Sequence, residues 1–157
     1  CAKAHGHAPP QVTSPQHSLA VPRAPVWDGI MPASAIQGTP GYQKTLLKAD
    51  ADGQGGMAAM TWSPLAEGYL VGTEPSRRES KMAWCYAQNE ARRERLGLVA
   101  ERHGQSSASI AIAFALATGS SVVVIGCSTV THLQDAVRGS SLRLTVEEAK
   151  FLQTGRV

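Results

Sequence analysis

The chain has 157 residues, of which 43% are apolar and 17% charged, and its formal net charge is +3. This balance is typical of one folded domain with its own core and excludes a disordered chain. The basic residues do not cluster, so charge indicates neither a nucleic-acid nor a membrane-surface partner, and no apolar run approaches the roughly 20 residues of a spanning helix.

The three cysteines, Cys1, Cys85 and Cys127, are widely spaced and form no C-x-x-C pair. Neither a zinc site nor a redox dithiol is therefore indicated, and we expect reduced thiols in a cytoplasmic protein. The first residues contain no signal-peptide core. Because the chain starts at Cys1 rather than at a methionine, we expect it to begin partway through a larger fold.

The first half of the chain is irregular and rich in proline. The predicted elements, in chain order, are a strand over residues 11–14, a loop over 20–40, a helix over 39–50, a flexible connection over 50–56 and a strand over 57–62. The first strand ends at Pro15 and the second at Pro64, because proline lacks the N–H that a central strand needs.

The second half alternates helices with one strand. Asn89 is the predicted cap of a helix over residues 90–103 that stops at Gly104. Ser106 or Ser107 caps the next helix, which is apolar nearly all round and ends near residue 119. Residues 122–126 are β-branched and do not alternate with polar residues, which predicts a strand buried on both faces.

Two short helices complete the chain. Residues 131–137 form a predicted helix with Leu133, Ala136 and Val137 facing inward, and Thr145 to Glu148 is a capping-box pattern that opens a last helix. The succession of strands and helices predicts a parallel α/β sheet or barrel. Three parallel strands make a poor independent domain, because both edges stay uncovered, so the chain looks incomplete.

Ligands of parallel βα folds bind where strands lead into the next helices. The three such segments here, residues 14–19, 62–68 and 126–129, are rich in serine, threonine and glycine. Their backbone N–H groups predict a phosphate site. A simple helix cap is the competing interpretation for any one of these serines or threonines.

These segments also resemble the aldo/keto reductase family. Residues 62–68, Trp-Ser-Pro-Leu-Ala-Glu-Gly, resemble its aromatic-S-P-L-x-x-G turn after the seventh strand, and residues 14–19 are similar to its Q-P-Q-Y-S-L segment. Residues 124–135 resemble the closing I-P-G-x-S…Q-L-x-E-N segment. Residues 92–116 match the R-x-x-x-L…A-x-x-x-G…A-x-x-A-L-A pattern between them. Order and spacing match over nearly the whole chain.

The resemblance implies a (β/α)8 TIM barrel that uses NADP(H). Residues 1–157 are then the C-terminal portion of a single domain, about three βα units plus a C-terminal helix. The complete barrel is expected to reduce an aldehyde or ketone with NAD(P)H, with this portion supplying the cofactor cradle. The substrate and the oligomeric state cannot be inferred from these residues.

The resemblance also assigns cofactor roles to individual positions. Trp62 occupies the position that stacks on the nicotinamide, and Ser14 the position of the glutamine that binds its carboxamide. The remaining predicted cofactor-binding residues wrap the pyrophosphate (Ser63, Leu65, Gly68), belong to the closing segment (Gly126), contact the 2′-phosphate (Ser128, His132) or accept from the adenine amine (Asp135).

Several positions depart from the family pattern. The Tyr of the sixth-strand segment is His17, the Pro of I-P-G is Ile125 and the last Asn is Ala136. No Lys or Arg stands beside Ser128, where many members hold the 2′-phosphate, so a preference for NADP over NAD is left open. Losing such a charge-assisted contact costs on the order of 1.5–3 kcal/mol.

No catalytic residue is assigned. The family's Asp, Tyr, Lys and His lie on the first four strands, which are not in this chain, and the tyrosines at 42, 69 and 86 are expected to pack or to face solvent. Arg77, Arg78, Arg92 and Arg93 are interpreted as solvated, although either of the first two can reach a phosphate from the loop after strand seven.

Five other side chains have both a structural and a functional interpretation. Cys127 is expected to be a small filler. Trp27 and Trp84 either line a substrate pocket or cover the barrel rim. His5-Gly6-His7 is interpreted as a solvated helix end, and no metal site is predicted.

Two functions are compatible with the residues. The first is a fragment of a carbonyl reductase; the second is a half-barrel or pseudoenzyme that binds a dinucleotide or a partner. A structural fragment that binds no cofactor is the third alternative, if the half-barrel does not fold. The coding sequence upstream of Cys1 discriminates the first two. For the chain itself we expect no turnover of an aldehyde with NADPH, and weak or absent cofactor binding.

Overall fold

A computed structural model describes residues 5–8, 11–27 and 57–156. Its sheet has three parallel strands in the order β1-β2-β3, namely Val12–Thr13, Ala58–Trp62 and Val122–Val124. Val12 lies opposite Ala58, and Met60 lies opposite Val122. The three predicted strands and their parallel pairing are confirmed. The expected helix over 39–50 and the connection over 50–56 lie outside the described residues.

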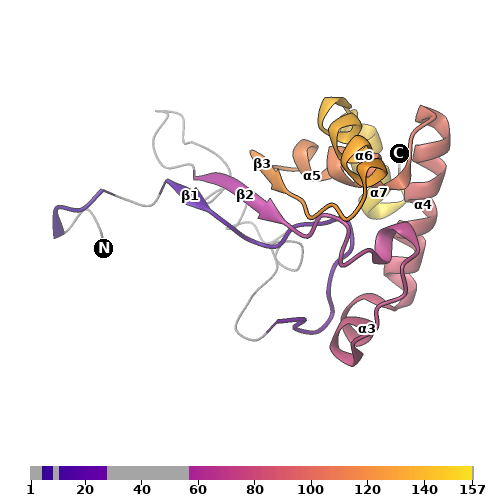
Figure 1. Cartoon of the computed structure of the whole chain (residues 1–157), viewed down its shortest axis with the longest axis horizontal. Helices are drawn as coiled ribbons and strands as arrows, with labels where there is room; N and C mark the ends of the chain where they lie inside the picture. Colours follow the sequence, from indigo (N-terminus) through magenta and orange to yellow (C-terminus); the bar gives the residue numbers. More distant parts are fainter. Residues whose placement is uncertain (1–4, 9–10, 28–56, 157) are drawn as a thin grey trace.

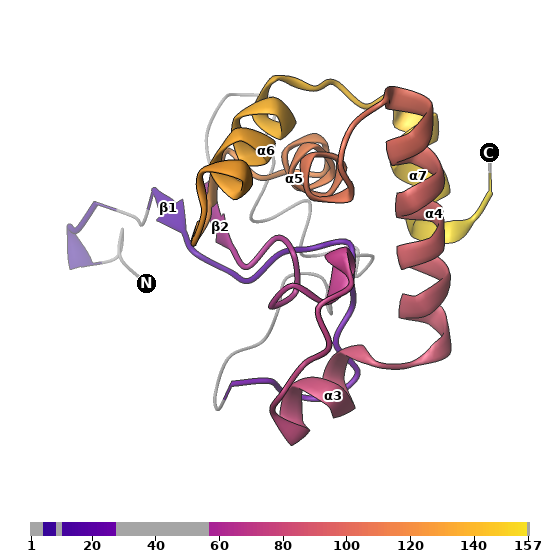
Figure 2. The same ribbon diagram turned by 45° about the vertical axis from the view of Figure 1, so that its right-hand side comes forward.

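The described part of the chain has five α-helices, three between β2 and β3 and two after β3: α3 (Arg78–Trp84), α4 (Ala87–His103), α5 (Ser107–Ala117), α6 (Val130–Ser141) and α7 (Val146–Thr154). A 3-10 turn, η2 (Tyr69–Val71), comes before them. The helices gather at one end of the extended sheet (Figure 1). From the turned view, α6 lies beside α5 and α7 runs along α4 (Figure 2). Neither α3 nor η2 was predicted from the sequence.

Local capping chemistry fixes most helix ends as expected. The Ser106 hydroxyl accepts a bond from Ser109 N–H, and Thr145 with Glu148 forms the predicted capping box. Gly104 ends α4 in the left-handed conformation, with φ 59°. The predicted start of α4 was wrong: the helix begins at Ala87, and Asn89 is buried inside its first turn.

Asn89 is not a cap because its amide connects the loop after β1 to α4. Its side-chain oxygen accepts from Val21 N–H, and its NH2 group donates to the carbonyl oxygens of Val21 and Trp84, all at 3.0 Å. A buried amide with this many partners holds two remote segments together.

The burial predicted for β3 and α6 was wrong. Val122 and Val124 are 52% and 43% exposed, because β3 is the outer strand of the described sheet. On α6, Ala136 is buried as predicted, whereas Leu133 and Val137 are 49% and 58% exposed. Periodicity identified these elements correctly, but what covers them depends on neighbouring elements.

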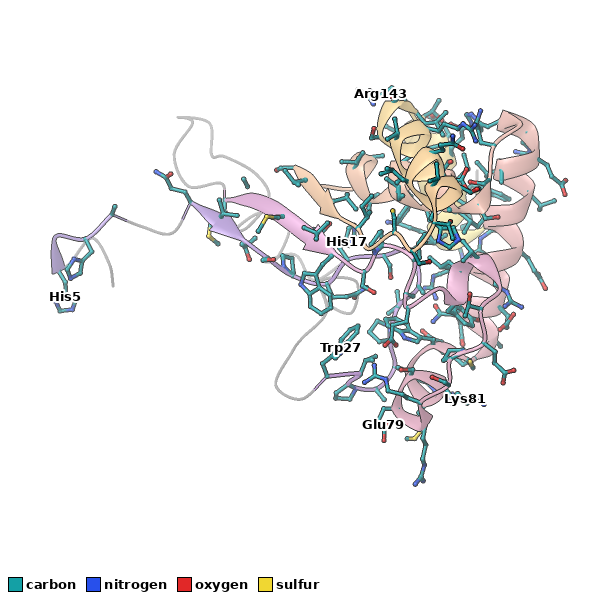
Figure 3. All side chains as sticks on the ribbon, in the orientation of Figure 1. His5, His17, Trp27, Glu79, Lys81 and Arg143 are labelled. Atoms are coloured by element: carbon teal, nitrogen blue, oxygen red, sulfur yellow. The ribbon has the colours of Figure 1, made fainter. Side chains whose placement is uncertain are left out.

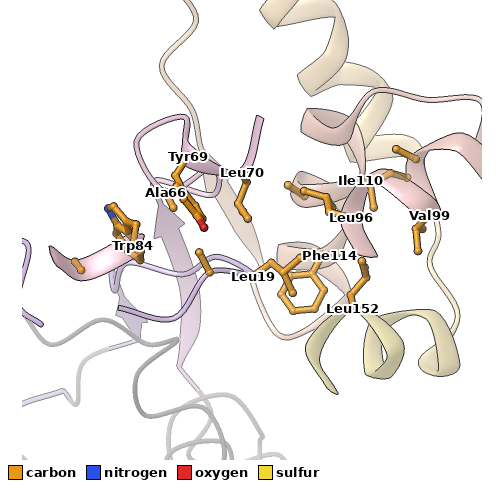
Figure 4. Close-up of a cluster of buried hydrophobic side chains, with 14 of the residues drawn as sticks. Leu19, Ala66, Tyr69, Leu70, Trp84, Leu96, Val99, Ile110, Phe114 and Leu152 are labelled. Atoms are coloured by element: carbon orange, nitrogen blue, oxygen red, sulfur yellow. The ribbon is translucent and has the colours of Figure 1, made fainter. Parts of the chain in front are cut away.

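The hydrophobic core lies between the helices and the loops that leave β1 and β2. Leu19 and Leu70 from those loops meet Leu96, Phe114 and Leu152 from three helices (Figure 4). The core therefore fixes the strand-end loops to the helices, which is the placement that a site at the strand ends requires. In the segments that the structure describes, no helix is long and apolar enough to cross a membrane.

Candidate functional site

The turn after β2 has an unusual backbone. Ser63, Ala66, Glu67 and Gly68 all have positive φ, between 51° and 88°. Inside the turn, Ala66 N–H donates to the Ser63 carbonyl oxygen at 3.1 Å and Glu67 N–H to the Ser63 hydroxyl oxygen at 3.4 Å. Three non-glycine residues in the left-handed region are costly, so the surrounding structure must hold the turn in place.

Gly68 has two reasons to be glycine. Its φ is 88°, which residues with a Cβ rarely adopt, and a Cβ there would lie 2.9 Å from the Cβ of Thr73. The chain returns at Thr73 to donate its N–H to the Gly68 carbonyl oxygen. Gly68 therefore allows the turn and the following segment to approach closely.

Glu67 ties the same turn to α3. Its carboxylate accepts bonds from the Trp84 indole N–H at 3.0 Å and from the guanidinium of Arg77. Burial acts to raise the pKa of Glu67, but the hydrogen bonds from Trp84 and Arg77 together with the charge of Arg77 lower the pKa below its usual value. Arg77 is thus ion-paired, which the interpretation as a solvated residue missed.

The turn forms one wall of a cleft of about 880 Å³. The start of α5 and the segment from β3 into α6 form the other walls. This cleft brings together seven of the nine predicted cofactor-binding residues: Ser63, Leu65, Gly68, Gly126, Ser128, His132 and Asp135. They come from the turn after β2 and from the segment that leads from β3 into α6, about sixty positions later in the sequence.

At the α6 end of the cleft, side chains lie around the first turn of the helix. The Ser128 hydroxyl and His132 Nδ1 are 3.2 Å apart. Thr129 caps α6 by accepting from His132 N–H. Unpaired N–H groups in a first helical turn, with the positive end of the helix dipole behind them, favour an anion.

Asp135 lies deeper on the same helix. Its carboxylate is 3.3 Å from Arg138 Nη1, and its backbone carbonyl accepts from the Ser109 hydroxyl at 2.8 Å. Gly139 makes this approach of α6 to α5 possible, since a Cβ there would lie 2.5 Å from the Ser109 carbonyl oxygen. The α5–α6 contact therefore sets the position of Asp135 in the cleft.

The other two predicted residues, Ser14 and Trp62, do not line the cleft. They lie next to each other, because the Trp62 indole N–H donates to the Ser14 carbonyl oxygen at 3.1 Å. The Ser14 hydroxyl donates to the Met60 carbonyl oxygen at 2.9 Å. The ring of Trp62 meets that of Trp27 edge-on, with centroids 4.8 Å apart.

His17, which stands at the tyrosine position of the family segment, is buried between the sheet and α5 (Figure 3). Its Nε2 is 2.8 Å from the Thr118 hydroxyl, which itself donates to the Phe114 carbonyl oxygen. Nε2 must therefore carry the proton and donate it. Burial lowers the pKa of His17 to about 4, so the ring is neutral near pH 7.

Both described tyrosines are committed to packing, as expected. The Tyr69 hydroxyl donates to Glu90 at 2.6 Å, and the Tyr86 hydroxyl donates to the Val21 carbonyl oxygen at 2.6 Å. Burial, the hydrogen bond to Glu90 and the charge of Glu90 raise the pKa of Tyr69. The same expectation for Tyr42 concerns a residue outside those that the structure describes.

Two sequence interpretations change at the cleft. Cys127 is exposed and lines it, so it is not a filler. Arg93, which was interpreted as a solvated charge on a helix face, lines it as well. Trp84 is fully buried, and neither it nor Trp27 is among the lining residues. Within 5–8, 11–27 and 57–156, no group of three His, Cys, Asp or Glu residues is placed to hold a metal ion.

Comparison with known proteins places this arrangement in a family. The Aldo/keto reductase family profile matches residues 42–154, and the chain belongs to that family. It is 43% identical over 70 residues to the aldo-keto reductase ausK of Aspergillus calidoustus, which covers 43% of this chain and 18% of that protein. It is 30% identical over 109 residues to versiconal hemiacetal acetate reductase of Aspergillus parasiticus, which covers 62% of this chain and 32% of that protein.

Solved structures show the same fold. The apo form of Gox0644 superposes with a TM-score of 0.58 at 14% identity, over 99% of this chain and 41% of that one. A mutant of Gox0644 in complex with NADPH gives a TM-score of 0.56 at 14% identity, over 97% and 40%. The chain thus spans less than half the length of the structures that it matches, and the matched parts cover a third or less of the curated relatives.

Proposed function

We propose that this chain is the C-terminal portion of an aldo/keto reductase (β/α)8 barrel and that its cleft binds the adenosine diphosphate part of NADP(H). One observation carries the proposal: residues from the ends of β2 and β3, selected by their family motifs, line a single cleft. A dinucleotide needs such a site, with backbone N–H groups and small side chains at two adjacent strand ends.

Different residues of the cleft bind different parts of the coenzyme. The turn formed by residues 63–68 lies against the pyrophosphate, because Gly68 leaves room for a close approach and the Ser63 side chain is small. Ser128 and His132 hold the 2′-phosphate, and the Asp135 carboxylate accepts from the adenine amine. Trp62, which directly precedes Ser63 in the chain, then offers its ring to the nicotinamide.

In the complete barrel this portion positions the coenzyme, which supplies a hydride to an aldehyde or ketone when bound. The proton donor comes from the strands that are not in this chain. The relative from Aspergillus parasiticus is named for reduction of a hemiacetal acetate, which supports a small-molecule carbonyl-type substrate. Binding of NADP is proposed over NAD because the start of α6 offers Ser128 and His132 to a second anion.

The proposal is tested by NMR titration of the isotope-labelled chain with millimolar NADPH, because we expect the isolated chain to bind weakly. Shift changes are expected at Ser63, Gly68, Ser128 and His132, and not on α7. Gly68→Ala should abolish them, since its Cβ would clash with Thr73.

Gly104→Ala is the matched control for the strain. Gly104 also has a positive φ, 59°, but a Cβ there meets nothing within 4 Å, and it does not line the cleft. It should therefore retain the NADPH response that Gly68→Ala loses. Shift changes confined to residues outside the cleft, or none at all in the unmodified chain, would contradict the proposed function.

A further inference from the structure

Arg93 is the one lysine or arginine among the described residues that line the cleft. It reaches the cleft from α4. No family motif marks this position, and the proposed function above does not use it.

The guanidinium of Arg93 is held from behind. Its Nη2 is 2.9 Å from Glu90 Oε2, and its Cζ lies 5.3 Å from the centre of the Tyr69 ring. Tyr69 is buried and donates its hydroxyl to the other oxygen of Glu90 at 2.6 Å. This backing reduces the rotamer freedom that a surface arginine loses on binding a ligand.

Arg93 keeps binding capacity despite this ion pair. A guanidinium has five N–H donors, and Glu90 is bound through one nitrogen. The side chain is 40% exposed. Two carboxylates also line the cleft, but Glu67 is paired with Arg77 and Asp135 with Arg138, so neither is an uncompensated charge opposing an anion.

The position of Arg93 selects the part of the ligand it can reach. Tyr69, on which it rests, directly follows Gly68 of the turn. Helix α4 ends at His103, and α5 begins shortly afterwards, with Ser109 in its first turn contacting Asp135. At about 1.5 Å per residue, Arg93 lies about 15 Å along the axis of α4 from His103, and so from this end of the cleft. Arg93 is thus at the turn end of the cleft, where the proposed function places the pyrophosphate.

We propose that Arg93 binds the diphosphate of the coenzyme and is the cation of this cleft, an inference that rests on the proposed function. An arginine can contact two phosphate oxygens at once, and it brings a positive charge that the neutral backbone of the turn does not have. The residue compensates for the missing cation beside Ser128 by strengthening the opposite end of the site.

The test compares Arg93→Gln with the unmodified chain by NMR titration with NADPH, NADH and 2′-AMP. Arg93→Gln should weaken NADPH and NADH equally, by about tenfold, which corresponds to about 1.4 kcal/mol. It should leave 2′-AMP unchanged, because that probe carries no diphosphate. Arg102→Gln removes the same charge from the same helix outside the cleft lining and should change none of the three by more than about twofold.

Arg93→Lys keeps the positive charge and is the variant to measure if Arg93→Gln does not fold. It should give an affinity for NADPH and NADH between those of the unmodified chain and Arg93→Gln. Unchanged dinucleotide affinity in both variants overturns the inference, and so does a loss confined to NADPH, which would place Arg93 at the 2′-phosphate. If the unmodified chain binds none of the probes, the proposed function fails and this inference fails with it. Binding by the unmodified chain with no effect at Arg93 leaves the proposed function intact.

Discussion

His17 is neutral in the folded chain because its surroundings admit only the uncharged ring. It is 4% exposed, stacks beside Phe114 and donates from Nε2 to Thr118. The charged imidazolium would be cut off from water here, so burial lowers the pKa of His17 from 6.5 to about 4. The core therefore contains a titratable side chain.

This shift predicts a loss of stability in mild acid. Between pH 6.5 and about 4 the unfolded chain binds a proton at His17 that the folded chain does not, so the free energy of unfolding falls as the pH falls through this window. From about pH 7.5 to about pH 5 the loss attributable to His17 should be about 2 kcal/mol. Urea unfolding at the two pH values measures it.

His17→Gln is the control, because it keeps a side-chain N–H donor and does not titrate. The other histidines are unchanged in this variant, so the difference between the two chains isolates His17. The same pH dependence in both chains would show that the folded-state pKa is not lowered.

Two glycines within helices allow the effect of packing on stability to be measured apart from the effect of helix propensity. Gly139 lies where α6 crosses α5, and an added Cβ would lie 2.5 Å from a backbone oxygen, which cannot move without separating the helices. Gly97 lies on α4, and a Cβ there meets nothing within 4 Å. The same substitution should therefore have opposite effects.

We expect Gly139→Ala to lower the free energy of unfolding by about 1–3 kcal/mol, and Gly97→Ala to raise it by about 0.5–1 kcal/mol. Thermal and urea unfolding measure both. Gly139→Ala should also weaken the response of Asp135 to NADPH, because the α5–α6 contact positions that residue. A stabilising effect at both glycines would show that α5 and α6 do not approach this closely in solution.

The elements that were predicted correctly are those encoded locally. The Ser106 cap, the Thr145 capping box and the Gly104 stop each depend on residues within one turn, so sequence alone identifies them. Asn89 has the same composition signal as a cap, but its partners are Val21 and Trp84, which only the folded chain brings near. Likewise, the exposure of β3 depends on what lies next to it in the sheet.

The candidate site shows the same division between local and long-range information. Motifs identified Ser63, Gly68 and Ser128 from their own neighbourhoods, and these residues line one cleft. Arg93 was missed because its role depends on Tyr69 and Glu90 bringing it to the cleft wall. No spacing along the chain indicates that contact.

The molecule as a whole is expected to bind a coenzyme without reducing a carbonyl. Reduction needs a proton donor beside the carbonyl oxygen, poised by a lowered pKa. Of the two tyrosines that the structure describes, Tyr86 donates to the Val21 carbonyl oxygen and Tyr69 is buried against Glu90, which raises its pKa. Both are directed away from the role that the family gives a tyrosine.

We therefore expect the 157-residue chain, mixed with NADPH and an aromatic aldehyde, to show no loss of reduced-nicotinamide absorbance above that of buffer. A full-length member of the family under the same conditions is the positive control, and the NMR titration establishes that the coenzyme is bound when the assay is run. Turnover that disappears in Tyr69→Phe would contradict the prediction, because a buried phenol with a raised pKa would then be acting as the proton donor. Turnover that persists in that variant would also contradict it and would require a donor within the cleft, for which His132→Gln is the next substitution to measure.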